Sequence, residues 1–155
     1  MPNNNHRLTL RREWLGTSGR VNWLMLNPST ADERFDDPTI RKCVGFSKRW
    51  GFSSMIVTNL FSFRATDPKD LHALIRGGGY VRAIGDGNDE AIANAANESD
   101  LVVVAWGAGA ARYKERIIEV RNMFLRPSCI GVTKDGYPIH PCMAAYTDEP
   151  LIYTK

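Results

Sequence analysis

The chain has 155 residues, of which 43% are hydrophobic and 24% are charged, and its formal net charge is +3. This length suits one domain, and the composition excludes the disordered class. No apolar run approaches the roughly 20 residues that span a bilayer, and the polar amino end, residues 1–6, is unlike an export signal. We therefore expect a single cytoplasmic domain, residues 1–155, without a membrane partner.

The cysteines and glycines lack the spacing of a metal or cofactor site. Cys43, Cys129 and Cys142 are odd in number and widely spaced, which fits reduced thiols and no disulfide framework. The glycine clusters at 77–79 and 85–87 match neither a phosphate loop nor a dinucleotide-binding turn, so they predict flexible loops. We expect no metal and no cofactor. The mild positive charge is compatible with a nucleic acid partner without requiring one.

The first third of the chain predicts strands around one helix. Residues 7–14 alternate loosely and residues 17–20 form a turn signal, so we expect an edge hairpin leading into the first core strand. Residues 21–26 are an apolar run closed by Asn27 and a proline, whose missing N–H ends the pairing. Asp37 and the proline after it predict a helix start that continues to about Gly51.

The rest of the chain alternates between strand and helix patterns. The predicted elements are a strand at 54–60, a helix from Pro68, a helix at 88–97, a strand at 101–105, a helix at 110–124 and a strand at 128–132. This order is typical of an α/β fold, a three-layer α/β/α sandwich with a mostly parallel central sheet. Residues 1–20 would form an edge segment and residues 21–146 the core.

Four positions at predicted strand ends could carry chemistry. In open α/β sheets, ligands bind where the carboxyl ends of parallel strands meet. This rule selects Asn27, Asn59, Trp106 and His140. Each also has a structural interpretation: Asn27 as part of an Asn-Pro turn, Asn59 as a loop cap and His140 as a core histidine. The sequence leaves both kinds of interpretation open.

Carboxylates follow the first two predicted core strands. Asp32, Asp36, Asp37 and Asp67 could bind a divalent metal or act as a general base. Helix capping is the alternative for Asp36 and Asp37. Asp36 is therefore only a reserve candidate for catalysis.

Longer motifs resemble a known family. Residues 26–32 are L-N-P-S-T-A-D, residues 36–40 are D-D-P-T-I, residues 59–68 are N-L-F-S-F-R-A-T-D-P, and residues 133–141 are T-K-D-G-Y-P-I-H-P. From Arg12 to Tyr146 the chain resembles a bacterial and phage family called domain of unknown function 1643. Shorter stretches, around Asn27, Asn59, Trp106 and His140, resemble motifs of the uracil-DNA glycosylase superfamily, in its mismatch-specific thymine/uracil branch.

The second resemblance implies a fold and a set of roles. It implies a uracil-DNA glycosylase-like fold in which Asn27 positions the attacking water, Asn59 reads the edge of a flipped pyrimidine, and His140 stabilises the departing base. The substrate-binding residues on this interpretation are Asn59, Phe35, Phe61, Pro28, Ser29 and Trp106. Phe35 or Phe61 would supply an aromatic platform for the base.

The leading hypothesis is a DNA glycosylase-like hydrolase in DNA repair or DNA modification. It would act as a monomer on DNA that contains a damaged or modified pyrimidine, after the base has been flipped out of the stack. One alternative is a non-catalytic nucleobase- or DNA-binding module. The other is an enzyme that acts on free nucleotides or modifies a base without excising it. A fold alone cannot decide between them.

Overall fold

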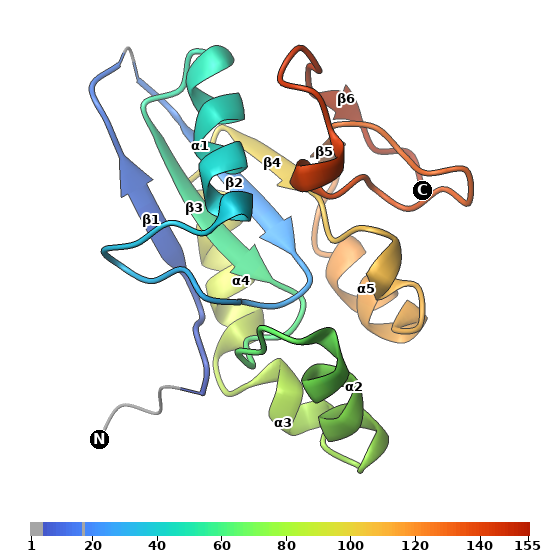
Figure 1. Cartoon of the computed structure of the whole chain (residues 1–155). Helices are drawn as coiled ribbons and strands as arrows, with labels where there is room; N and C mark the ends of the chain where they lie inside the picture. The colour runs from blue at the N-terminus through green and yellow to red at the C-terminus, as the bar shows by residue number, and fades with distance from the viewer. Residues whose placement is uncertain (1–4, 17) are drawn as a thin grey trace.

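One mixed sheet organises the molecule. The computed structural model describes residues 5–16 and 18–155. Its strands are β1 (Leu10–Glu13), β2 (Arg20–Met25), β3 (Ser54–Asn59), β4 (Leu101–Val104), β5 (Ser128–Cys129) and β6 (Leu151–Ile152). In this part of the chain they form a six-stranded sheet in the order β1-β3-β2-β4-β5-β6 (Figure 1). The α/β class predicted from the sequence is confirmed.

The prediction of a mostly parallel sheet was wrong. Strands β3, β2, β4 and β5 are parallel, but β1 pairs antiparallel with β3 and β6 pairs antiparallel with β5. Unpaired backbone groups at the edge of a sheet invite further pairing. Here β1 and β6 pair with the two outer strands of the parallel part of the sheet, and the sequence patterns gave no sign of β6, which has only two residues.

The amino-terminal hairpin was also a wrong prediction. Strand β1 pairs with β3, with Leu10 opposite Val57, and not with the following strand β2. Both edges of β2 are already used, because it lies between β3 and β4. The chain therefore passes from one edge of the sheet to its middle. The predicted turn includes residue 17 and the predicted polar end includes residues 1–4, which lie outside the described residues.

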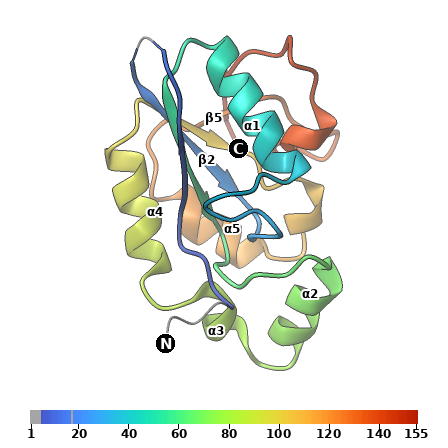
Figure 2. The same cartoon turned by 60° about the vertical axis from the view of Figure 1, so that its left-hand side comes forward.

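Helices cover both faces of the sheet (Figures 1 and 2). They are α1 (Pro38–Arg49), α2 (Pro68–Arg76), α3 (Tyr80–Ile84), α4 (Asn88–Asn97) and α5 (Lys114–Arg121). Helix α1 begins as predicted, because Asp37 caps it by accepting a 2.9 Å hydrogen bond from the Ile40 N–H. Helix α3 lies between the two glycine clusters that predicted loops. Helix α5 is shorter than the helix predicted at 110–124, and a separate 3₁₀ turn, Ala108–Ala110, precedes it.

Two apolar clusters lie on opposite faces of the sheet, because neighbouring side chains of a strand point to opposite sides. On β2, Trp23 belongs to the cluster that includes Phe46 of α1. The next residue, Leu24, belongs to the cluster that includes Leu71 of α2 and Ile92 of α4. The two clusters hold the sheet rigidly, and with it the ends of its parallel strands.

Among the described residues, the helices all lack the combined length and hydrophobicity of a membrane-spanning segment.

Val103 tests the core. Its side chain is 0% exposed on β4, so Val103→Ala should lower the free energy of unfolding by roughly 1–3 kcal/mol through lost burial and a cavity. Val81 on α3 is 77% exposed, so the same substitution there should change stability by no more than about 0.5 kcal/mol. Urea denaturation measures both variants. Equal losses would mean that Val103 is not a core residue.

Candidate functional site

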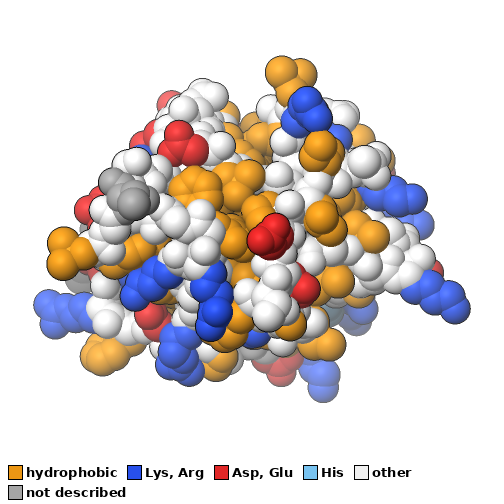
Figure 3. Space-filling model, turned by 90° about the horizontal axis from the view of Figure 1, so that it is seen from above, with side chains coloured by type: hydrophobic (Ala, Val, Ile, Leu, Met, Phe, Trp, Pro, Cys, Tyr) orange, Lys and Arg blue, Asp and Glu red, His pale blue; other side chains and the backbone are white. Residues whose placement is uncertain are grey.

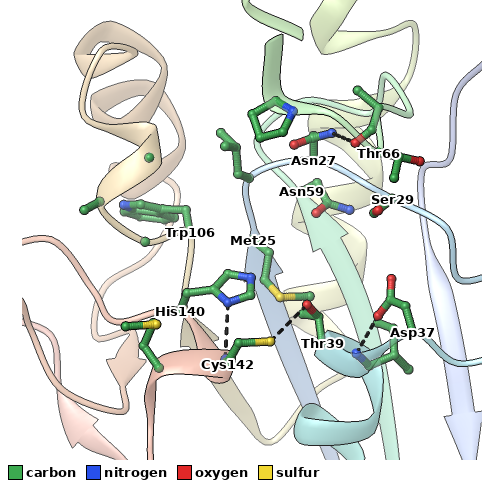
Figure 4. Close-up of a pocket in the computed structure, with 18 of the residues that line it drawn as sticks. Met25, Asn27, Ser29, Asp37, Thr39, Asn59, Thr66, Trp106, His140 and Cys142 are labelled. Atoms are coloured by element: carbon green, nitrogen blue, oxygen red, sulfur yellow. Dashed lines mark hydrogen bonds between the residues drawn. The ribbon is translucent and has the colours of Figure 1, made fainter. Parts of the chain in front are cut away.

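A cavity of about 420 Å³ lies at the carboxyl ends of β2, β3 and β4. Asn27 follows β2, Asn59 ends β3, Trp106 follows β4, and His140 precedes a short 3₁₀ turn, Pro141–Met143. All four side chains line the cavity, with Asn27 and Asn59 on one side and Trp106 and His140 on the other (Figure 4). The volume lies within the roughly 300–1,000 Å³ of small-molecule sites.

Asn59 is a buried amide without partners. Its side chain is only 1% exposed, and neither its oxygen nor its nitrogen has a hydrogen-bond partner among the described residues. Its backbone is well held, because its carbonyl accepts a 3.0 Å bond from the side chain of Asn88. A buried polar group without a partner costs stability. The unpaired donor and acceptor of Asn59 therefore suit a ligand that offers one of each.

Asn27 has a fixed amide orientation. Its side-chain nitrogen donates to the carbonyl oxygens of Pro28, at 3.1 Å, and Ala65, at 3.1 Å, with a longer contact of 3.5 Å to that of Phe63. Only an NH₂ group can donate to carbonyls, so these contacts assign the nitrogen to that side and the oxygen to the other. Asn27 consequently has an acceptor oxygen that no described residue uses and that can hold a water.

One ring nitrogen of His140 has a hydrogen-bond partner, and the other has none among the described residues. Its Nδ1 accepts a 3.2 Å bond from the backbone N–H of Cys142. In the neutral ring the proton is then on Nε2, which is a donor. Burial lowers the pKa of His140 below its usual value, and the charge of Asp37 opposes this shift only in part. The ring is therefore neutral near pH 7 and can donate a hydrogen bond from Nε2.

Trp106 brings an indole N–H to the same cavity. It is buried, and its Nε1 has no hydrogen-bond partner within residues 5–16 and 18–155. The next residue, Gly107, has φ of +78°, and a Cβ there would lie 3.2 Å from the Cβ of His140. Glycine thus lets the strand end turn closely past His140. The W-G pair in the sequence has a structural reason as well as a chemical one.

The structure separates the other predicted substrate-binding residues. Ser29 lines the cavity, whereas Pro28 is buried and turns its carbonyl to the Ala65 N–H at 3.0 Å. Phe61 is fully buried and packs edge-on against a tyrosine in the core. Phe35 is 69% exposed. Neither phenylalanine lines the cavity. The buried indole ring in the cavity wall is that of Trp106.

The loop carboxylates have structural partners. Asp36 pairs with Arg12 at 2.8 Å, and Asp67 caps α2 by accepting from the N–H of Lys69. Asp32 accepts two backbone hydrogen bonds within its own turn, which lower its pKa. Asp37 both caps α1 and lines the cavity. The described residues contain no group of three His, Cys, Asp or Glu side chains that could hold a metal ion.

Sequence reasoning missed some lining residues. Arg7, Thr39 and Thr66 contribute to the cavity, although none of them ends a strand. Thr39 is in the first turn of α1, two residues after Asp37, and a polar helix start at this edge is a signal that could have been used. No pattern marks Arg7, which reaches the site only through tertiary pairing.

The comparison with known families identifies the chain at the level of its family. A family model described as "Protein of unknown function (DUF1643)" matches residues 7–142. The chain belongs to this family. No curated protein and no solved structure matches the chain.

Two buried asparagines provide a matched test of the site. Asn59→Leu should leave the free energy of unfolding unchanged or raise it, because this substitution removes a buried amide without partners. Asn22 on β2 is equally buried, but its NH₂ group donates to Thr58 and to the Ile56 carbonyl. Asn22→Leu should therefore cost about 1–3 kcal/mol. Chemical denaturation measures both, and a large loss in the Asn59 variant would indicate a structural role.

The pKa of His140 predicts a pH dependence. The unfolded chain gains a proton at His140 as pH falls below about 6.5, whereas the folded protein, with its lowered pKa, gains it only at lower pH. As the pH falls from the pKa of the unfolded chain to that of the folded protein, protonation of His140 therefore lowers the free energy of unfolding. Between about pH 7.5 and 5, the wild type should lose more stability than His140→Gln. Denaturation at both pH values and an NMR titration of the ring provide the measurement, and equal losses would exclude the shift.

Proposed function

We propose that this protein is a DNA glycosylase-like hydrolase that recognises a flipped, damaged or modified pyrimidine and cleaves its N-glycosidic bond. The observation that carries the proposal is the buried amide of Asn59, whose donor and acceptor are both unpaired at a cavity wall. The Watson–Crick edge of a pyrimidine offers an acceptor next to a nitrogen donor: a carbonyl and N3–H in uracil or thymine, and N3 and the amino group in cytosine. The two edges are complementary.

The remaining polar groups suit the chemistry of base release. A water held by the free oxygen of Asn27 attacks C1′ of the sugar, and the bond from C1′ to the base nitrogen breaks. The bond electrons leave with the base, and the neutral Nε2–H of His140 donates to the charge that develops on it. The unpaired indole N–H of Trp106 is a further donor for a base carbonyl. The proton that the water loses ends on the departing base, directly or through solvent, so the products are the neutral free base and an abasic sugar.

The size and place of the cavity also support the proposal. A cavity of about 420 Å³ admits one nucleobase and not a duplex, so the base must leave the stack before it reacts. Apolar clusters on both faces of the sheet are consistent with a three-layer α/β/α sandwich of uracil-DNA glycosylase type. In such sheets, ligands bind at the carboxyl ends of parallel strands.

Base release from defined oligonucleotides tests the proposal. The protein is incubated with strands that each carry one modified pyrimidine, and mass analysis identifies released bases and abasic products. On the strand that reacts, His140→Ala should lower the rate by about 10²- to 10³-fold, because a donor to a developing anion is lost. His72→Ala is the matched control, because His72 is on α2 and does not line the cavity.

The other outcomes distinguish the competing functions. Base-dependent DNA binding without any abasic product would favour a non-catalytic binding module. Turnover of free nucleotides that is indifferent to the DNA strand would favour a nucleotide enzyme. Unchanged specific activity in the His140 variant would remove His140 from the mechanism.

A further inference from the structure

Two arginines meet next to the cavity because the amino-terminal segment pairs with the chain that follows β3. The Arg7 N–H donates to the Ser62 carbonyl at 2.9 Å, and the Arg64 N–H donates to the Asn5 carbonyl at 2.7 Å. His6 and Phe63 form an antiparallel bridge between these contacts. This pairing fixes the backbone of both arginines.

Both guanidinium groups reach the same neutral acceptor. Nη1 of Arg7 donates to the carbonyl oxygen of Ala31 at 2.5 Å, and Nη2 of Arg64 donates to it at 3.3 Å. Nε of Arg7 is buried and has no hydrogen-bond partner among the described residues. In the same part of the chain, neither arginine forms an ion pair with a carboxylate. Two cations therefore share one carbonyl.

The carboxylates near Arg7 and Arg64 already form hydrogen bonds or ion pairs with other groups. Asp32 accepts from its own turn, Asp36 pairs with Arg12, and Asp37 caps α1. Asp37 and Asp32 partly offset the burial and the repulsion from Arg64 that lower the pKa of Arg7 to about 10. Arg7 stays protonated at neutral pH. Among the described residues, the half-buried guanidinium of Arg7 has a buried, unpartnered Nε and no carboxylate in an ion pair, so a bound anion would relieve the arrangement.

Arg7 connects two cavities. It lines the cavity that contains Asn59, and together with Arg64 it lines an adjacent pocket of about 320 Å³. The adjacent pocket also contains Arg34, Asp32 and Glu33, so its arginines exceed its carboxylates by one. An anion held by Arg7 and Arg64 would thus be next to a base held in the first cavity.

We propose that Arg7 and Arg64 form a phosphate-binding subsite for the nucleotide whose base occupies the Asn59 cavity. This inference rests on the proposed function for the identity of the base. Guanidinium groups bind phosphate oxygens through paired, charge-assisted hydrogen bonds, and Nε of Arg7 is an unused donor for this purpose. The phosphate is either a diester of a DNA strand or the terminal group of a free nucleotide.

Figure 3 shows a different distribution of charge at one end of the molecule. Lys and Arg side chains lie at several places there, mostly at the lower left and the right of the view, with acidic side chains among them. A broad basic surface is one way to bind a phosphate backbone. The arginine pair is a different way, because it fixes one phosphate at a defined distance from one base.

Titration with inorganic phosphate tests the subsite directly. Arginine side-chain NMR should give saturable shifts of the Nε–Hε signals of Arg7 and Arg64, which sodium chloride at matched ionic strength does not produce. Arg64→Gln keeps an NH₂ donor but carries no charge, and it should weaken phosphate binding by about 10-fold or more. Arg64→Lys should restore part of the affinity. Backbone spectra verify that each variant is folded.

Arg126→Gln is the matched control, because Arg126 is exposed and lines neither cavity. It should bind phosphate as the wild type does. The subsite is overturned if phosphate gives no saturable shift, if chloride gives the same shift, or if the Arg126 and Arg64 variants lose affinity equally.

A second measurement identifies the source of the phosphate. Binding of thymidine, thymidine 5′-monophosphate and a short oligothymidylate is compared for the wild type and Arg64→Gln. If the phosphate belongs to DNA, the oligonucleotide binds most tightly, and the variant lowers the salt-dependence slope by about 0.7, the value for one contact on a single strand. If the phosphate belongs to a free nucleotide, thymidine 5′-monophosphate shows the largest gain in affinity over thymidine. No loss of phosphate-dependent affinity in the variant would refute the subsite in both cases.

The two proposals fail separately. A protein that releases no base from any oligonucleotide but binds phosphate through Arg7 and Arg64 retains the subsite and loses the hydrolase function. If Arg64→Gln releases the base at the wild-type rate and binds the substrate with wild-type affinity, the hydrolase function stands and the subsite is refuted.

Discussion

The candidate site depends on the parallel pairing of β2 with β3 on one side and β4 on the other. The register places Met25 opposite Asn59 and Leu24 opposite Val104. Since the three strands end together, the residues that follow them meet at one edge. The apolar clusters on both faces of the sheet prevent the strands from shifting, so Asn27 and Trp106 keep fixed positions relative to Asn59. A register shift of one residue would turn each side chain to the other face.

Three asparagine side chains differ in their hydrogen-bond partners although their sequence settings are similar. Asn22 and Asn59 are on neighbouring strands and are almost completely buried, yet only the Asn22 nitrogen donates within the sheet. Asn27 is different again, because its nitrogen holds the loop carbonyls of Pro28 and Ala65. Asn27 therefore combines a structural nitrogen with an available oxygen. The structural and the chemical interpretations of this residue are compatible, because each uses a different atom.

The amino-terminal segment contributes more than an edge strand. Its pairing beside Phe63 brings Arg7 to the cavity, and the contact of Arg7 with Ala31 attaches the loop after β2 to the rest of the site. This loop leads to Asp37, whose cap begins α1 and whose charge affects the pKa of His140. A substitution of Arg7 can therefore affect the cavity through the loop.

The sequence by itself determined where β2, β3 and β4 end, to within one residue, and where α1, α2 and α4 begin. Apolar runs closed by polar residues predicted Asn27, Asn59 and Trp106 at one edge, and Asp37 with its proline predicted the start of α1, because these signals depend on local backbone chemistry. Only the tertiary structure decided the rest. Antiparallel edge strands, the burial of Phe61, the exposure of Phe35 and the arrival of Arg7 all depend on contacts between distant segments, and local patterns contain no information about such contacts. Whether the amide of Asn59 had partners was decided in the same way, because its neighbours come from other parts of the chain.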